Sequence, residues 1–243
     1  MSTSLSSSPL IIGADLNSND SVQQMNVGAY AETPDGRGFR YALNGAVATI
    51  AGQVYQSAVL DATNDQPSGG LAVAAVAIGG TTITTSTSTT WAVNQFAGGY
   101  LSVVVTPGQG YLYRIKSNTA TAGAVGGVIV LEDPLVIALT SASKVIVIEH
   151  PYSNVIVAPA TPTGTLAGVA PSIISIARYG WIQTFGAASV LFTGTGAAGK
   201  AVGTLSGGTI GSAAPAIAAT NILGYHMATG ITAEYALIFL TIH

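Results

Sequence analysis

The sequence contains no cysteine, which excludes disulfide bonds and thiolate metal ligands. Charged residues are scarce as well: they make up 7% of the 243 residues, whereas typical soluble domains carry roughly 25%. The seven lysines and arginines are scattered singly, so the chain has no basic patch of the kind that binds nucleic acid. We therefore expect no nucleic-acid partner.

Long hydrophobic runs are also missing, although 49% of the residues are hydrophobic. A membrane-spanning helix needs about 20 consecutive apolar residues, and the longest candidates, 71–78 and 236–242, are much shorter. Aromatic residues, at 7%, form no obvious girdles of a transmembrane barrel. The first ten residues lack the positive charge and the apolar stretch of a secretory signal. We predict no membrane partner and synthesis inside the cell.

No segment of the first 160 residues shows the periodicity of a long amphipathic helix, and β-strand patterns fill the chain instead. The clearest hairpin is 100–116, where two strand-favouring runs flank the turn 106–110. Its second run places Tyr111, Tyr113 and Ile115 on one face and Leu112, Arg114 and Lys116 on the other. Further strands are expected within 71–78, 81–93, 126–139 (broken at Asp133-Pro134), 144–159, 172–186, 188–193 and 234–242. Residues 214–225 fit either a short helix or a strand.

These patterns predict an all-β fold of two β-rich modules, each an antiparallel sandwich or barrel, with an extended N-terminal arm. The arm covers 1–28, which are rich in Ser, Asn and Gln. The first module covers 29–160 and the second 161–243. The proline- and glycine-rich stretch 158–171 is predicted to be the linker between them.

A glycine-rich stretch, 192–204, spells two nucleotide-binding patterns at once. Residues 194–201 fit G-x-x-x-x-G-K-A, and the same glycines fit G-x-G-x-x-G. Ala201 stands where a P-loop needs a Ser or Thr hydroxyl for Mg²⁺, and the four glycines of 202–211 disfavour the helix that must follow. We therefore interpret the stretch as a β-hairpin loop, with Lys200 as a solvated charge and no nucleotide cofactor.

Catalytic and metal-binding constellations are weak. The three histidines, His150, His226 and His243, lie far apart, and no G-x-S-x-G motif supports a serine nucleophile. The pair Glu132-Asp133 precedes a proline and indicates a turn.

Two further carboxylates, Asp61 and Asp65, lie with Asn64 in a loop that has too few ligands for a typical calcium site. A hydrolase that uses Asp61, Asp65 or Glu149 stays open as a hypothesis, but we predict no enzyme activity, no catalytic residue and no metal.

Five aromatic residues of the first module have two possible roles. They are Trp91, Phe96, Tyr100, Tyr111 and Tyr113. They could line a carbohydrate-binding surface, but alternate aromatic positions in strands more often form a core.

The second module resembles a type of module found in virion proteins of tailed bacteriophages. The matching residues are a G-W-x-Q-T-x-G strand at 180–186, a G-x-x-V-G loop at 199–203 and an apolar strand at 236–240. The segment 131–159 is similar to the middle of such proteins. The resemblance implies a decoration, cement or fibre component that binds a capsid lattice and forms trimers.

From the residues themselves, apolar and charge-poor strands expose edges that favour aggregation unless neighbours cover them, and symmetric oligomers do so. Together with this expectation of an oligomer, the resemblance implies a homotrimeric decoration (cement) protein, made in the host cytoplasm, that binds the major capsid protein on the outer surface of the virion. The alternative is a tail or head fibre subunit, an adhesin that binds host surface glycans.

Overall fold

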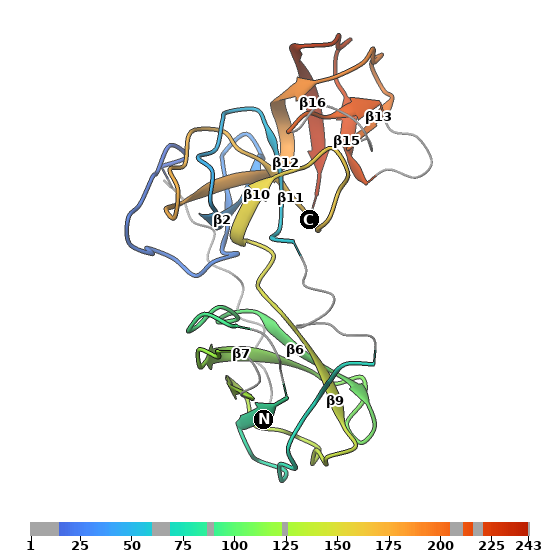
Figure 1. Cartoon of the computed structure of the whole chain (residues 1–243). Coiled ribbons are helices and arrows are strands. Elements are labelled where there is room, and N and C mark those ends of the chain that lie inside the picture. Colours follow the sequence, from blue (N-terminus) through green and yellow to red (C-terminus); the bar gives the residue numbers. More distant parts are fainter. Residues whose placement is uncertain are drawn as a thin grey trace. The chain divides into compact units, whose positions relative to one another are not determined.

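A computed structural model describes residues 15–59, 69–86, 90–122, 126–204, 211–215 and 221–242 (Figure 1). The predicted all-β class is confirmed: sixteen strands are assigned, and the described residues contain no helix. Within those residues, no helix is long and apolar enough to cross a membrane. The chain divides into two compact units: unit 1 holds Met1–Ala58 together with Pro151–His243, and unit 2 holds Val59–His150.

This division differs from the boundary expected at residue 160. Unit 2 is inserted between two strands of unit 1, β3 (Val54–Gln56) and β10 (Ser153–Val157), which pair with each other antiparallel. The stretch 158–171 connects strands within unit 1 and does not separate two modules. Gln56 fixes it, because its Nε2 donates a 2.8 Å hydrogen bond to Thr163 Oγ1. Proline and glycine content alone does not distinguish such a packed loop from a linker.

Unit 2 is one six-stranded barrel-like sheet. Its strand order is β4 (Leu71–Ala72), β9 (Lys144–Ile148), β6 (Tyr100–Val105), β7 (Leu112–Asn118), β8 (Gly127–Leu131) and β5 (Thr82–Thr85). The ring closes where Ala74 donates its amide to Thr84 O and Ser86 donates its amide to Ala72 O. The predicted hairpin is β6–β7, and Tyr113 and Ile115 are buried while Leu112, Arg114 and Lys116 are exposed, as expected.

The interior of unit 2 is an apolar core centred on Trp91. The Trp91 and Phe96 rings meet edge to face with centroids 4.9 Å apart. Gly127 is required beneath Trp91, because a Cβ at that position would lie 2.1 Å from the indole. The run 71–78, which the sequence predicts to be buried, is buried only in part. Leu71 of the two-residue strand β4 lies in the core, whereas Ile78 is exposed.

Unit 1 contains a first ring of five strands, in which only the β10–β2 pair is parallel. The order around the ring is β2 (Gly38–Asn44), β10, β3, β11 (Leu166–Val169) and β12 (Tyr179–Phe192), and β12 pairs with β2 to complete it. Side chains alternate across β2 and β12, so Ala42 and Ile182 face the interior while Tyr41 and Trp181 face outward. The short strand β1 (Tyr30–Glu32) pairs with Gly38–Arg40 of β2, on the edge opposite β12.

Part of the N-terminal arm covers the outward-facing aromatics of the first ring. Leu16 and Met25 pack on the cluster that contains Tyr41 and Trp181. Asp20 exchanges two backbone hydrogen bonds of 2.9 Å with Tyr179, which extends the sheet by one bridge. Residues 15–28 therefore pack on unit 1, and residues 1–14 lie outside the described part.

A second ring in unit 1 shares strand β12 with the first. Beyond Phe185, β12 pairs with β16 (Glu234–Thr241), followed by β15 (Ile222–His226), β13 (Ala201–Gly203) and β14 (Ala214–Pro215). An isolated β-bridge between Ala213, just before β14, and Phe192, the last residue of β12, closes this second ring. Figure 1 shows β12 continuing from the strands around β2 to β15 and β16. The segment 214–225 thus contributes strands, and its residues 216–220 lie outside the described part.

These closures change the expectation about exposed strand edges. Each ring pairs its strands with strands of the same chain, so the sheets leave mainly short edges such as that of β1. The described strands therefore do not need neighbouring copies to cover their edges, contrary to the expectation from the charge-poor sequence. The outer faces of the sheets are the surfaces that remain.

Candidate interaction surface

The glycine-rich stretch 192–204 connects β12 to β13, and its backbone amides are already in use. Gly194 donates to Thr232 Oγ1 at 2.8 Å, Gly196 donates to Gly230 O at 2.9 Å and Gly199 donates to His226 O at 2.8 Å. A phosphate-binding loop needs such amides directed at the ligand. The geometry agrees with a structural loop.

The loop is not the predicted hairpin turn, however. β12 and β13 are separated in the sheet by β16 and β15, so the loop crosses between non-neighbouring strands. No helix follows it, because the chain enters β13 directly at Ala201. Lys200 is exposed, as expected.

His226, on β15, lies under this loop and is 3% exposed. Its imidazole meets the Phe192 ring edge to face at 4.7 Å, and a Cβ on Gly196 would lie 1.9 Å from its Nε2. Within the described residues, neither ring nitrogen has a hydrogen-bond partner. Burial lowers the pKa of His226, and a smaller contribution from the Ala228 backbone opposes that shift. The residue is therefore a neutral core imidazole near neutral pH.

Among the remaining histidines and the carboxylates of the hydrolase hypothesis, only His150 and Glu149 lie within the described part of the chain. His150 and Glu149 belong to unit 2, where Glu149 Oε1 accepts a 3.0 Å hydrogen bond from Gln95 Nε2. Asp61, Asn64, Asp65 and His243 lie outside the described residues. Among the residues that the structure describes, no three His, Asp or Glu side chains gather in a way that could hold a metal ion.

Glu132 and Asp133 follow β8 in an exposed turn, in agreement with the sequence. Arg114 Nε lies 3.3 Å from Glu132 Oε1, and both side chains are partly exposed.

The aromatic residues of unit 2 mostly form its core. Trp91, Phe96 and Tyr113 are buried, as the core interpretation expects. Tyr111 is exposed and stacks on Tyr113 with ring centroids 6.3 Å apart. These residues therefore offer a single exposed ring, Tyr111, and a partly buried one, Tyr100.

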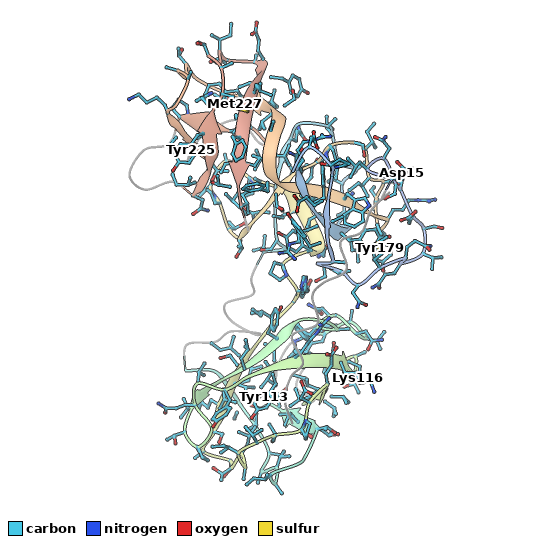
Figure 2. All side chains as sticks on the ribbon, turned by 180° about the vertical axis from the view of Figure 1, so that it is seen from behind. Asp15, Tyr113, Lys116, Tyr179, Tyr225 and Met227 are labelled. Carbon is cyan, nitrogen blue, oxygen red and sulfur yellow. The ribbon has the colours of Figure 1, made fainter. Side chains whose placement is uncertain are left out.

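The most distinctive surface lies on the second ring of unit 1. Five large apolar side chains project outward from β15, β16 and the residue after β15, and each is between 37% and 54% exposed. We call them the outer apolar face: Tyr225, Met227, Tyr235, Leu237 and Phe239. Tyr225 and Met227 are labelled in Figure 2, in this part of unit 1.

Strand register holds the members of this face together. Tyr225 lies directly opposite Phe239 in the β15–β16 pair. Met227 donates its amide to Leu237 O at 2.9 Å, which aligns the next two members. Phe185 of β12 meets Phe239 edge to face at 5.2 Å and extends the face sideways. Cross-strand neighbours of this kind point to the same side of a sheet.

The neighbouring part of β12 carries small side chains. Ala187 lies opposite Phe239, and Ser189 lies opposite Leu237. The outer positions of β12, β16 and β15 therefore form a ridge of large apolar side chains beside a trough of small ones. None of these residues is charged.

A pocket of about 450 Å³ adjoins the trough. Its walls combine Ala187, Ser189 and Tyr235 with residues of the 50–53 turn and of the end of β11. The Tyr235 ring lies against Gly52, where a Cβ would be 2.4 Å from its Cε1. Glycine is therefore necessary at residue 52 for this wall to form, and its φ of +80° also favours glycine.

Polar groups stand at one end of the pocket. Arg37 lines it, and its Nε donates a 2.8 Å hydrogen bond to Asp35 Oδ2. The Thr33 hydroxyl, and then Arg37, hold the pKa of Asp35 below its usual value. Gln183 also lines the pocket, and its Nε2 donates to Ala187 O at 2.9 Å. The pocket thus presents a cation, an amide and an aromatic ring within mainly apolar walls.

The outer apolar face was not predicted from the sequence, although the stretch 234–242 contains a pattern that indicates it. The stretch 234–242 was expected to be a strand, which is confirmed, but its apolar residues do not alternate with polar ones. A strand that is apolar at successive positions is typical of burial on both faces. Position 239 and its neighbours therefore indicate a second covered face, and the described residues leave that face exposed.

Comparison with protein-family models, with curated proteins and with solved structures finds no match to this chain.

Proposed function

We propose that this chain is a structural protein of a tailed-bacteriophage virion, which decorates the outer capsid surface as a homotrimer and binds the major capsid protein. The observation that carries the oligomeric part of the proposal is the outer apolar face, a contiguous and uncharged surface of unit 1. Patches of this kind mark interaction sites on soluble proteins. The capsid role is supported by the resemblance to virion modules.

The resemblance of 180–186, 199–203 and 236–240 to virion modules supports the same proposal. In the structure, these three segments come together in unit 1: the first and third belong to β12 and β16, and the second contains β13. A shared rigid unit is what a repeated lattice contact requires, because the same geometry must be presented at every position. Stabilisation of the shell follows if one such oligomer contacts more than one capsid subunit.

The test is binding to shells of the matching phage that lack the protein. Purified protein should co-sediment with those shells at a fixed ratio and raise their melting temperature. If the protein at micromolar concentration stays in the supernatant when the shells are pelleted, the decoration role is refuted. Empty shells of an unrelated phage serve as the control for non-specific adsorption.

The pocket beside Tyr235 supports a second candidate function, a fibre or adhesin subunit that binds host surface glycans. Its volume falls within the range of small-ligand pockets, roughly 300–1,000 Å³. Tyr235 supplies a flat apolar ring, and Gln183 and Arg37 stand at the polar end. A sugar unit, with one apolar face and several hydroxyls, matches such a lining.

Two measurements separate the candidates. A glycan array with the isolated protein should show specific binding under the second function, and Arg37→Ala should weaken that binding. Microscopy of virions with a labelled protein should place it on the head shell under the first function and on a fibre under the second.

A further inference from the structure

We propose that the outer apolar face is covered by another copy of this chain, so that the ridge of one copy packs into the trough of the next. This inference rests on the proposed function in one respect: it identifies the surface that joins the copies of the oligomer. It does not involve the surface that meets the capsid.

The pattern of β16 is the first argument. Ala236, Ile238 and Leu240 fill the core of the second ring, while Tyr235, Leu237 and Phe239 stand on the opposite side. Both faces of this strand are therefore apolar, which is typical of strands covered on both sides.

Among the described strands, β8 is also apolar on both sides, but its outer side chains are half-buried, and other outer faces carry charges or are covered. On β7 of unit 2, the outer positions are Leu112, Arg114 and Lys116. On the first half of β12, the outward ring of Trp181 is covered by the arm. The outer side of β15 and β16 thus combines an apolar pattern with high exposure, which contact with a partner would remove.

Shape is the second argument. The ridge side chains stand next to the trough of Ala187 and Ser189 on the same sheet face. The pocket beside Tyr235 deepens the trough at one end. A ridge beside a trough is self-complementary, because the ridge of each copy has a matching trough on its neighbour. Such packing closes around a two-fold or a three-fold axis.

Charge and area are the third argument. The five side chains of the face and the trough residues Ala187 and Ser189 carry no charge, so contact between these positions brings no like charges together. Five half-exposed side chains, at about 200 Å² each when fully exposed, supply roughly 500 Å² of apolar area per copy. With the small residues of the trough, this approaches the area of about 800 Å² per partner in a standard interface.

The test is the native mass of wild-type protein and of two matched variants. Leu237→Glu places a charge in the centre of the face, at a side chain that is already exposed and outside the core cluster. Leu112→Glu places the same charge on an exposed outer strand position of unit 2. We expect wild type and Leu112→Glu to show the mass of two or three chains, and Leu237→Glu to show the mass of one.

Cysteine cross-linking gives an independent measurement, because the natural sequence has no cysteine. Oxidation of a mixture of Leu237→Cys and Ser189→Cys chains should yield covalently linked chains, because the ridge of one copy meets the trough of the next. A mixture of Leu112→Cys and Ser189→Cys chains should stay single. A wild-type mass of one chain, a Leu237→Glu variant that keeps the oligomer, or no cross-link in the mixture of Leu237→Cys and Ser189→Cys chains would each overturn the inference.

Failure of this inference differs from failure of the proposed function. A monomer that binds shells would refute the copy-to-copy contact and leave the decoration role in place. An oligomer that loses its mass on Leu237→Glu but never binds shells would support the contact and refute the role.

Discussion

Asp20 and Tyr41 are joined by a 2.7 Å hydrogen bond from the Tyr41 hydroxyl to Asp20 Oδ2, which ties the N-terminal arm to strand β2. The amide of Gln24 donates to the same hydroxyl at 3.3 Å. Burial, and then Asp20, raise the pKa of Tyr41 to about 12. One phenol thus fixes two points of the arm over the first ring.

Tyr41→Phe should loosen the arm. The substitution removes the hydroxyl while it keeps the ring that packs on Trp181, so we expect a loss of about 1 kcal/mol in the free energy of unfolding. Urea unfolding measures that loss, and limited proteolysis reports exposure of residues 15–28. Asp20→Asn keeps a hydrogen-bond acceptor and should cost less. Equal stability of wild type and Tyr41→Phe would contradict a role for this contact.

The glycine loop should respond to packing and not to nucleotide. Gly196→Ala brings a Cβ against His226 Nε2, and overpacking of this kind costs about 1–3 kcal/mol. Lys200→Ala, four residues away and exposed, should change the stability by less than about 0.5 kcal/mol. Thermal melts of both variants give the comparison.

Nucleotide binding has its own test on the same wild-type protein. Because the loop amides already donate to protein acceptors, ATP with Mg²⁺ should leave the melting temperature unchanged. A rise that depends on ATP concentration would instead establish a nucleotide site.

Acid should destabilise the second ring through His226. Its pKa in the folded protein is lowered from the ordinary value of 6.5, so on acidification the unfolded chain binds a proton before the folded one does. The stabilising contribution is therefore complete above about pH 6.5 and is lost as the pH falls below that value.

The measurement compares wild type with His226→Gln between pH 7.5 and 5. The free energy of unfolding should fall more steeply in wild type, because only wild type carries the extra titrating group in the core. Parallel curves for the two proteins would contradict the assignment. Because the slopes of the free energy of unfolding against pH are compared, a pH-independent loss of stability caused by the substitution does not affect the result.

Much of the fold was predictable because β-sheet signals are local. The alternation in 111–116 gave the correct faces of β7, and the turn at 106–110 gave the correct hairpin. Ring closure was not predictable in this way, since β2 pairs with β12, and Arg40 meets Ile182 across a long stretch of chain. Local patterns carry no information about such partners.

The candidate surface was missed for a related reason. Tyr235, Leu237 and Phe239 resemble core residues in the sequence, and only the closure of the ring shows that they face outward. The expected boundary at residue 160 differs from the structure because the proline-rich stretch 158–171 resembles a linker, although it contains strand β11 and contacts Gln56.

Unit 2 should be removable. It leaves and re-enters unit 1 between β3 and β10, which pair antiparallel, so the two flanking ends leave the same end of neighbouring strands. A chain in which a short Gly-Ser linker replaces 59–150 should keep cooperative unfolding of unit 1. The isolated 59–150 segment should also fold, since its core cluster lies wholly within it.

Circular dichroism and thermal melts of both pieces check this. Two transitions in the full chain that match those of the pieces are the expected result. Loss of β structure in either piece would show that the units depend on each other.

The insertion of unit 2 also determines the order in which the two units can fold during synthesis on the ribosome. Strand β3 ends at Gln56, but β12, which completes the first ring, begins only at Tyr179. At about 5–20 residues per second, the early strands therefore emerge roughly 6–25 s before their closing partner. During that interval unit 2, whose strands are contiguous in the chain, can finish folding. The unit synthesised in the middle is thus the first to be complete, and the one that contains the N-terminus is the last.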